Sequence, residues 1–209
     1  MTAAPSLSPP IVIAHRGASG ERPEHTIAAY ELAIRQGADV IEPDLVPTKD
    51  GALVARHENE ISETTDVADH PEFAARKATR TIDGKELTGW FTEDFTLAEL
   101  KTLRAKERLP LMRPGNRGYD GQETIPTFEE VIALAKKHRV AIYPETKHPS
   151  YFASIGKGTD APLVAALQKA GWDSAEAPVF IQSFEVKNLQ RLKRMTEVRL
   201  IQLLSLIHI

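Results

Sequence analysis

The chain has 209 residues, a formal net charge of −3, and 42% apolar and 26% charged residues, a composition typical of a globular domain with its own core. It contains no cysteine, which excludes disulfides, thiolate zinc sites and a cysteine nucleophile. The slightly acidic balance disfavours a general binder of nucleic acid or of anionic membranes, since such proteins usually carry a basic excess.

The first part of the chain alternates between strands and a helix. Strands are predicted at 11–14 (IVIA), 39–45 (DVIEPDL) and 52–57 (ALVARH). Between the first two, a helix is predicted over 26–37, with Thr26 as its N-cap and Gly37 at its end.

Residues 58–95 are polar and without a clear period, and residues 104–125 have a loop-like composition with several prolines and glycines. Between them, a short helix is predicted over 96–103, which Thr96 and Glu99 open as a capping box. We predict that 58–125 is an insertion after the third strand, within a single domain that spans 1–209.

Regular elements return after residue 125. Helices are predicted at 127–139, 160–171 and 185–195, and strands at 140–145, 178–184 and 198–204. Thr127 and Glu130 form a second capping box. Strands that alternate with helices predict an α/β fold with a parallel sheet and crossover helices. Six strands are predicted in all, and an eight-stranded barrel would need at least two more.

The two ends carry predictions of their own. The start, MTAAPSLSPP, has neither a basic nor an apolar region, so it is not a signal peptide as written. No apolar run approaches the roughly 20 residues of a membrane-spanning helix. As written, the chain is therefore predicted to be cytoplasmic, although a processed secreted protein would look the same. The final LSLIHI looks like a broken reading frame, and we expect a truncated chain.

Polar residues gather where the predicted strands end. In chain order they are His15 and Arg16, Glu42 and Asp44, His57, Glu145 and Lys147, and Gln182 and Ser183. In parallel α/β folds the carboxyl edge of the sheet is where sites are built. Five strands that place polar groups at one edge predict a functional site there.

Three of these residues are carboxylates. Glu42 and Asp44 are two apart on a strand and share a face, and Glu145 comes to the same edge. Three converging carboxylates repel one another without a cation, and an oxygen donor set suits calcium or magnesium. Pro43 removes a ladder donor between the first two, which predicts an irregular strand at that point.

The other polar groups suit the chemistry of a phosphoryl group. His15 and His57 titrate near neutrality and can transfer protons. Arg16 and Lys147 supply fixed positive charge for an anion. Together with a metal, this set favours phosphodiester cleavage over sugar or acyl chemistry.

Each residue also has a purely structural interpretation. Glu145 and Lys147 could form a surface ion pair, and Gln182 and Ser183 could cap the next helix. Glu24 could pair with Arg16 and position it, or it could merely lie in the first turn of the helix. His25 is expected to flank the Thr26 cap, and His70, His138 and His148 are expected at the surface.

The motifs HRG, PEHT, EPDLVPTKDGALVARHE, YPETK and QSF resemble, in order and spacing, those of the glycerophosphodiester phosphodiesterase family. The likeness is greatest to the bacterial periplasmic type, whose members carry a long insertion after the third strand. It covers about residues 11 to 204.

The resemblance implies a TIM (β/α)8 barrel that hydrolyses glycerophosphodiesters to sn-glycerol 3-phosphate and an alcohol. It implies that His15 and His57 are the acid/base pair and that Arg16 and Lys147 contact the phosphate. Glu42, Asp44 and Glu145 would hold the metal, calcium or alternatively magnesium. In the family's proposed route the glycerol 2-hydroxyl attacks, and water then opens a cyclic phosphate. The implied partner is a small-molecule substrate.

Two alternatives stay open at this point. A relative with the same chemistry could act on lysophospholipid or on another phosphodiester. A chain that lacks the last barrel strands could instead be a non-catalytic, metal-binding fragment.

Overall fold

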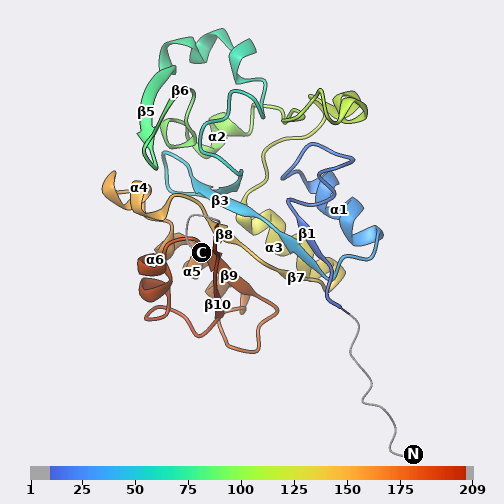
Figure 1. Cartoon of the computed structure of the whole chain (residues 1–209), viewed down its shortest axis with the longest axis vertical. Coiled ribbons are helices and arrows are strands. Elements are labelled where there is room, and N and C mark those ends of the chain that lie inside the picture. The colour runs from blue at the N-terminus through green and yellow to red at the C-terminus, as the bar shows by residue number, and fades with distance from the viewer. Residues whose placement is uncertain (1–9, 206–209) are drawn as a thin grey trace, which may run out of the picture.

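The computed structural model describes residues 10–205 (Figure 1). The first nine residues, on which the signal-peptide prediction mainly rests, and residues 206–209 of the unusual ending lie outside the described residues. Within 10–205, none of the helices combines the length and the hydropathy that crossing a bilayer requires.

Seven short strands run parallel and form the centre of the molecule. Three of them make one sheet in the order β1 (Ile13–His15), β2 (Val40–Glu42) and β7 (Ala141–Ile142). The other four are β10 (Arg199–Gln202), β9 (Phe180–Ser183), β8 (Glu145–Thr146) and β3 (Asp44–Pro47), in that order in the second sheet. The predicted parallel α/β arrangement is therefore confirmed in this part of the chain.

Two prolines divide what the sequence predicted as continuous strands. Pro43 separates β2 from β3, and Pro144 lies between β7 and β8. Neither proline has an N–H for the ladder. Their carbonyls still take part, since Pro43 accepts from the Glu145 amide and Pro144 from the Gln182 amide, both at 2.9 Å. The irregularity expected at Pro43 is thus a change from one sheet to the other.

The strand predicted at 52–57 differs from the expectation. It is β4 (Leu53–Ala55), and it pairs antiparallel with β3 as the return arm of a hairpin. It is therefore not a member of the parallel set. β4 runs back toward the start of β3, so the Arg56 amide donates to the Asp44 carbonyl at 3.0 Å. His57, the next residue, therefore lies beside Asp44.

The helices lie where the sequence predicted them, with one addition. They are α1 (Ile27–Arg35), α2 (Leu97–Leu100), α3 (Phe128–His138), α4 (Pro149–Ser154), α5 (Asp160–Ala170) and α6 (Val186–Leu192). Thr26 caps α1, and both predicted capping boxes are present, at α2 and at α3. The sequence analysis missed α4, whose short turn has no apolar period to reveal it.

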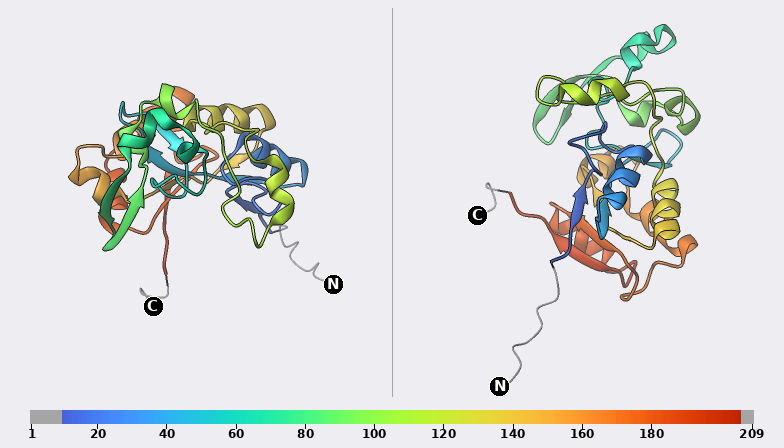
Figure 2. Two further views of the ribbon diagram at one scale, coloured as in Figure 1. Left: turned by 90° about the horizontal axis from the view of Figure 1, so that it is seen from above. Right: turned by 90° about the vertical axis from the view of Figure 1, so that its right-hand side faces the viewer.

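The 58–125 segment has more structure than its composition predicted. It contains a hairpin of β5 (Ala78–Ile82) and β6 (Lys85–Gly89), and the 3-10 turns η1 (Val67–Asp69), η2 (Pro71–Arg76), η3 (Thr92–Asp94) and η4 (Pro114–Tyr119). The hairpin turns at Asp83 and Gly84, both of which have positive φ. Figures 1 and 2 show this segment, in teal to yellow-green, gathered at one end of the molecule.

Two hydrophobic clusters hold the molecule together. The larger packs α1, α3 and α5 against the parallel strands, and the smaller fills the 58–125 segment around Phe73, Trp90 and Phe95. Alternation along β3 joins them, because Leu45 faces the larger cluster and Val46 the smaller. The segment is therefore packed onto the strands that carry the site.

Candidate active site

A cavity of about 340 Å³ opens at the carboxyl ends of the parallel strands. Its lining contains all the predicted site residues except three, which are Glu24, Asp44 and Ser183. The lining residues are Ile13, His15, Arg16, Glu42, His57, Tyr143, Glu145, Lys147, Gln182, Phe184 and Leu203. The strand ends do meet at one edge, as expected for this class of fold.

The three predicted metal ligands converge beside this cavity. Oxygens of Glu42, Asp44 and Glu145 all lie within 4.8 Å of one another, and all three side chains are buried. Burial and the charge of Asp44 raise the pKa of Glu42 to about 9 and that of Glu145 to about 7. Burial alone would raise the pKa of Asp44 as well, but the hydrogen bond from His25 holds it below its ordinary value.

This cluster fits a hard cation. The Oδ1 atom of Asp44 is buried and has no hydrogen-bond partner, although a buried carboxylate oxygen normally has one. The donors are all carboxylate oxygens, as calcium and magnesium prefer. A divalent cation among them would offset the mutual repulsion that raises the pKa values of the two glutamates.

His25 orients Asp44. Its ring is fully buried, with Nε2 at 2.8 Å from Asp44 Oδ2 and Nδ1 at 2.7 Å from the Tyr30 hydroxyl. The sequence analysis placed His25 beside the Thr26 cap and did not foresee this contact. The residue takes a left-handed backbone (φ 56°), and its partner lies 19 residues away, so no local pattern announces the pair.

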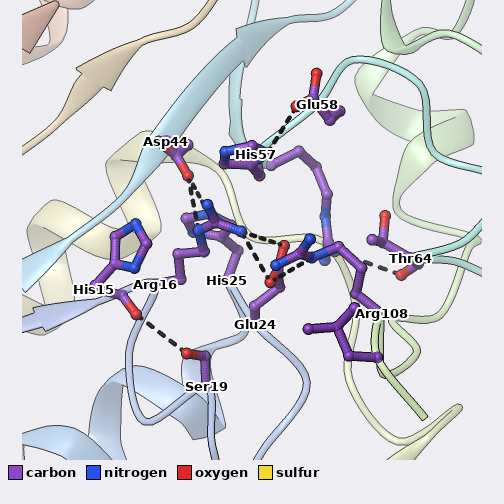
Figure 3. A network of polar contacts seen from close by, with 12 residues as sticks. His15, Arg16, Ser19, Glu24, His25, Asp44, His57, Glu58, Thr64 and Arg108 are labelled. Atoms are coloured by element: carbon purple, nitrogen blue, oxygen red, sulfur yellow. Dashed lines mark hydrogen bonds and ion pairs between the residues drawn. The ribbon is translucent and has the colours of Figure 1, made fainter. Parts of the chain in front are cut away.

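Glu24 holds Arg16 in place, as one of the two predicted interpretations required. The Arg16 Nη1 atom lies 3.2 Å from Glu24 Oε2, and Arg16 Nε lies 3.5 Å from Asp44 Oδ2 (Figure 3). Glu24 also accepts from Arg108 Nε at 2.9 Å. Arg108 belongs to the 58–125 segment and was not predicted to take part.

Lys147 is a buried counter-charge rather than half of a surface ion pair. Its Nζ atom lies 2.8 Å from Glu145 Oε1 and 3.5 Å from Asp44 Oδ1. Burial acts to lower the pKa of Lys147, but the charges of these two carboxylates raise it overall. The side chain lines the cavity and stays positively charged there.

The two histidines of the cavity have different surroundings. His15 stands at the exposed end of β1, where partial desolvation and the charge of Arg16 lower its pKa, which favours a neutral ring. His57 follows β4, and its Nδ1 atom lies 2.8 Å from Glu58 Oε1. Both rings line the same cavity.

Gln182 and Ser183 separate into two roles. Gln182 donates from Nε2 to Glu42 Oε1 at 2.8 Å and reaches the cavity. Ser183 does not line it, and its hydroxyl accepts from the Glu185 amide at the start of α6. Ser183 therefore bonds the N-cap residue of α6 without capping the helix itself, and Gln182 alone of the two reaches the site.

Comparison with known proteins agrees with these features. The sequence model of the glycerophosphoryl diester phosphodiesterase family matches residues 15–208. This chain belongs to that family. A glycerophosphodiester phosphodiesterase from Arabidopsis thaliana is 43% identical over 91% of the chain, and one from Haemophilus influenzae is 34% identical over 88%.

Solved structures show the same fold. A family member from Silicibacter pomeroyi matches with a TM-score of 0.71 at 22% identity, over 94% of this chain and 65% of that one. An Oleispira antarctica phosphodiesterase matches with a TM-score of 0.64 at 29% identity, over 89% of this chain and 62% of that one. The predicted TIM-barrel class is thereby confirmed.

The chain spans about half the length of the curated relatives it matches. It spans 54% of the length of the Arabidopsis protein and 52% of that of the Haemophilus protein. In the part that the structure describes, β1 and β7 are the outer strands of the three-stranded sheet, and β10 and β4 are those of the five-stranded sheet.

Proposed function

We propose that this chain is a metal-dependent phosphodiesterase that hydrolyses glycerophosphodiesters to sn-glycerol 3-phosphate and an alcohol. One observation carries the proposal: three buried carboxylates, two histidines and two cationic side chains surround or adjoin one cavity. The Oleispira relative, whose structure is a complex with the product sn-glycerol 3-phosphate, supports the choice of product.

The carboxylates give the site its metal dependence. Glu42, Asp44 and Glu145 would hold one Ca²⁺ ion, with Mg²⁺ as the alternative. When bound, the ion supplies positive charge that lowers the pKa of a glycerol hydroxyl and offsets charge on the phosphate. His25 keeps Asp44 oriented for this role through the bond to its Oδ2 atom.

The other residues handle the proton and the phosphate. His15 and His57 are the acid/base pair, one taking the proton of the attacking hydroxyl and the other protonating the leaving alcohol. Arg16 and Lys147 bind the phosphate oxygens, and both already sit among carboxylates that keep them charged and in position. Gln182 orients Glu42 through the bond to its Oε1 atom.

The size of the cavity favours a small substrate. Ligand cavities span about 300–1,000 Å³, and the 340 Å³ found here is near the lower limit. Glycerophosphocholine or glycerophosphoethanolamine suits such a volume, whereas most of a lysophospholipid's acyl chain would lie outside it. We propose that the 58–125 segment is an insertion within this single domain. Among the described residues, the cavity lining includes none from this segment, and His57 directly precedes it.

The test is the release of sn-glycerol 3-phosphate from glycerophosphocholine by the 209-residue chain. We expect release with calcium and none with excess chelator, restored when calcium is added back. Asp44→Asn is the matched variant, since it keeps the shape of the side chain and removes the charge at the cluster.

Each other outcome points elsewhere. Release that persists in chelator contradicts the metal-dependent reaction. Cleavage of lysophospholipid but not of glycerophosphocholine favours the related lipid-directed activity. Calcium binding without any release favours a non-catalytic metal-binding chain.

A further inference from the structure

A line of alternating histidines and carboxylates leads away from the cavity. It starts at His57 and continues through Glu58 and His148 to Asp83, at the turn of the β5–β6 hairpin. The proposed reaction uses only His57. The other three were either unassigned by the sequence or, in the case of His148, expected at the surface.

The contacts of this line are short and continuous. His57 Nδ1 lies 2.8 Å from Glu58 Oε1, the other oxygen of Glu58 lies 2.9 Å from His148 Nε2, and His148 Nδ1 lies 2.6 Å from Asp83 Oδ2. Figure 3 shows the first of these contacts, with Glu58 on the side of His57 that faces away from His15. Each of the two central side chains therefore uses both of its polar atoms within the line.

The electrostatics of the line are self-consistent. Burial acts to lower the pKa of His148, but the hydrogen bonds to Glu58 and Asp83 raise it overall. Burial acts to raise the pKa of Glu58, but the bonds to both histidines hold it well below its ordinary value. A carboxylate at each nitrogen favours the doubly protonated ring of His148, and both histidines favour the ionised form of Glu58.

Two members of the line have an unusual backbone conformation. His148, the N-cap residue of α4, has φ 44°, and Asp83 has φ 49°, both in the left-handed region that non-glycine residues rarely adopt. The side chain of His148 is only 14% exposed, which contradicts the surface position expected for it. Uncommon backbone conformations often accompany functional positions, because the surrounding structure must maintain them.

An ionised carboxylate at Nδ1 determines which tautomer the neutral His57 ring adopts. When the ring is neutral, Glu58 requires the proton to sit on Nδ1, and Nε2 is then the unprotonated nitrogen. A general base needs one nitrogen free and held in a fixed direction. The contact to Glu58 supplies both conditions, provided that Glu58 itself is held.

We propose that His148 is a positioning residue for His57, acting through Glu58, and that Asp83 of the β5–β6 hairpin in turn positions His148. The inference rests on the proposed role of His57 in proton transfer. It gives the 58–125 segment a part in catalysis, because the hairpin turn of that segment completes the line.

The variants separate positioning from folding. His148→Ala removes both contacts, His148→Gln keeps an amide donor for Glu58 but loses Asp83, and Asp83→Ala removes only the outer contact. His70→Ala is the matched control, because His70 also pairs with two carboxylates, Asp66 and Glu72, but lies outside the line.

Kinetics with glycerophosphocholine and calcium give the first measurement. We expect His148→Ala to lower kcat about 10- to 100-fold, as loss of a supporting partner typically does, with KM nearly unchanged. His148→Gln should recover part of the loss, Asp83→Ala should lower kcat less, and His70→Ala should match the unaltered chain. Full kcat in His148→Ala, or an equal loss in His70→Ala, would overturn the proposal.

Nuclear magnetic resonance of the histidine ring nitrogens gives a second measurement that needs no turnover. At a pH where the His57 ring is neutral, we expect the Nδ1–H form in the unaltered chain and a mixture of both forms in His148→Ala. An unchanged His57 ring in that variant would refute the positioning role. If the unaltered chain releases no product, the proposed function fails, and the ring spectrum still decides whether the line orients His57.

Discussion

The parallel strands and the 58–125 segment contribute to the candidate active site in different ways. The strands carry the side chains that line the cavity, such as Glu42, Glu145 and Gln182. The segment instead bonds side chains just outside the lining, where Arg108 bonds Glu24 and Asp83 bonds His148. The comparison teaches that the groups proposed to react sit on rigid elements, while the segment supplies side chains that contact their neighbours.

The largest expected effect concerns the side chains that line the cavity. His57→Ala should lower kcat by about 10²- to 10⁴-fold, because it removes one of the two groups that we propose transfer protons. It leaves the carboxylate cluster intact, so calcium should still raise the melting temperature. Activity assays and thermal melts with and without calcium check both parts.

Substitution of His138, which is exposed in the last turn of α3, is the control for that variant. His138→Ala should keep full activity. If His57→Ala keeps it too, the role given to His57 is wrong.

The next effect tests whether the segment is a separate body. Phe95 is fully buried in the smaller cluster, with its ring 5.0 Å from that of Phe73. Phe95→Ala should destabilise the protein by about 3–5 kcal/mol. Because β3 and β4 face both clusters, we expect one cooperative transition at lower temperature in calorimetry.

Two separate transitions would break this expectation and would mean that the segment unfolds independently of the strands. Leu111→Ala is the control, because this leucine is 96% exposed and its truncation leaves no cavity.

A third substitution tests how closely the loop after β1 packs on α1. Gly17 has φ +80°, and a Cβ at this position would lie 2.7 Å from the Ala29 carbonyl carbon. Gly17→Ala should lower the free energy of unfolding by about 2–5 kcal/mol, since alanine is strained in the left-handed region and its Cβ would clash with the backbone of α1. Denaturant unfolding measures the loss.

Gly20→Ala supplies the comparison for this variant, because nothing lies within 4 Å of the added carbon there. A similar loss in both variants would show that the close approach of Gly17 to α1 is not the cause.

The smallest effect concerns the edge of the segment and depends on pH. Two bonds to Arg76 and the capping bond from the Thr96 amide lower the pKa of Glu99 to about 2, from an ordinary value of 4.5. Because the folded-state pKa is the lower one, its contribution to stability is present above pH 4.5 and is lost as the pH falls through about 2.

Glu99→Gln should therefore lower the melting temperature by about 1–3 °C at pH 7, as expected for an exposed ion pair. The difference from the unaltered chain should shrink as the pH falls below 4.5. A difference that stays constant down to pH 2 would mean that the charge of Glu99 does not contribute.

The sequence predicted the strand-borne half of the site well, for a physical reason. Residues at the ends of parallel strands share an edge whatever the intervening loops do, so Glu42, Glu145 and Lys147 could be brought together from their positions alone. The three capping threonines were equally readable, because a helix start depends on neighbours within one turn.

The rest depended on contacts that no local pattern encodes. His25 reaches Asp44, and Arg108 reaches Glu24, only because loops far apart in the sequence pack together. The β5–β6 hairpin was different, since Asp83 and Gly84 between alternating residues are a recognisable turn signal that the polar composition obscured. The strand at 52–57 was predicted and is present as β4, but its antiparallel direction was not foreseen, because a short apolar strand has the same sequence pattern in either direction.

The break at Pro43 has a mechanical consequence. Glu42 belongs to the three-stranded sheet, while Asp44 and Glu145 belong to the five-stranded one, so the carboxylate cluster spans the joint between the two. A cation bound there would link the two sheets, and its binding affinity would depend on the angle between them. A substitution far from the cavity that tilts one sheet would thus loosen the ion without altering any of its ligands.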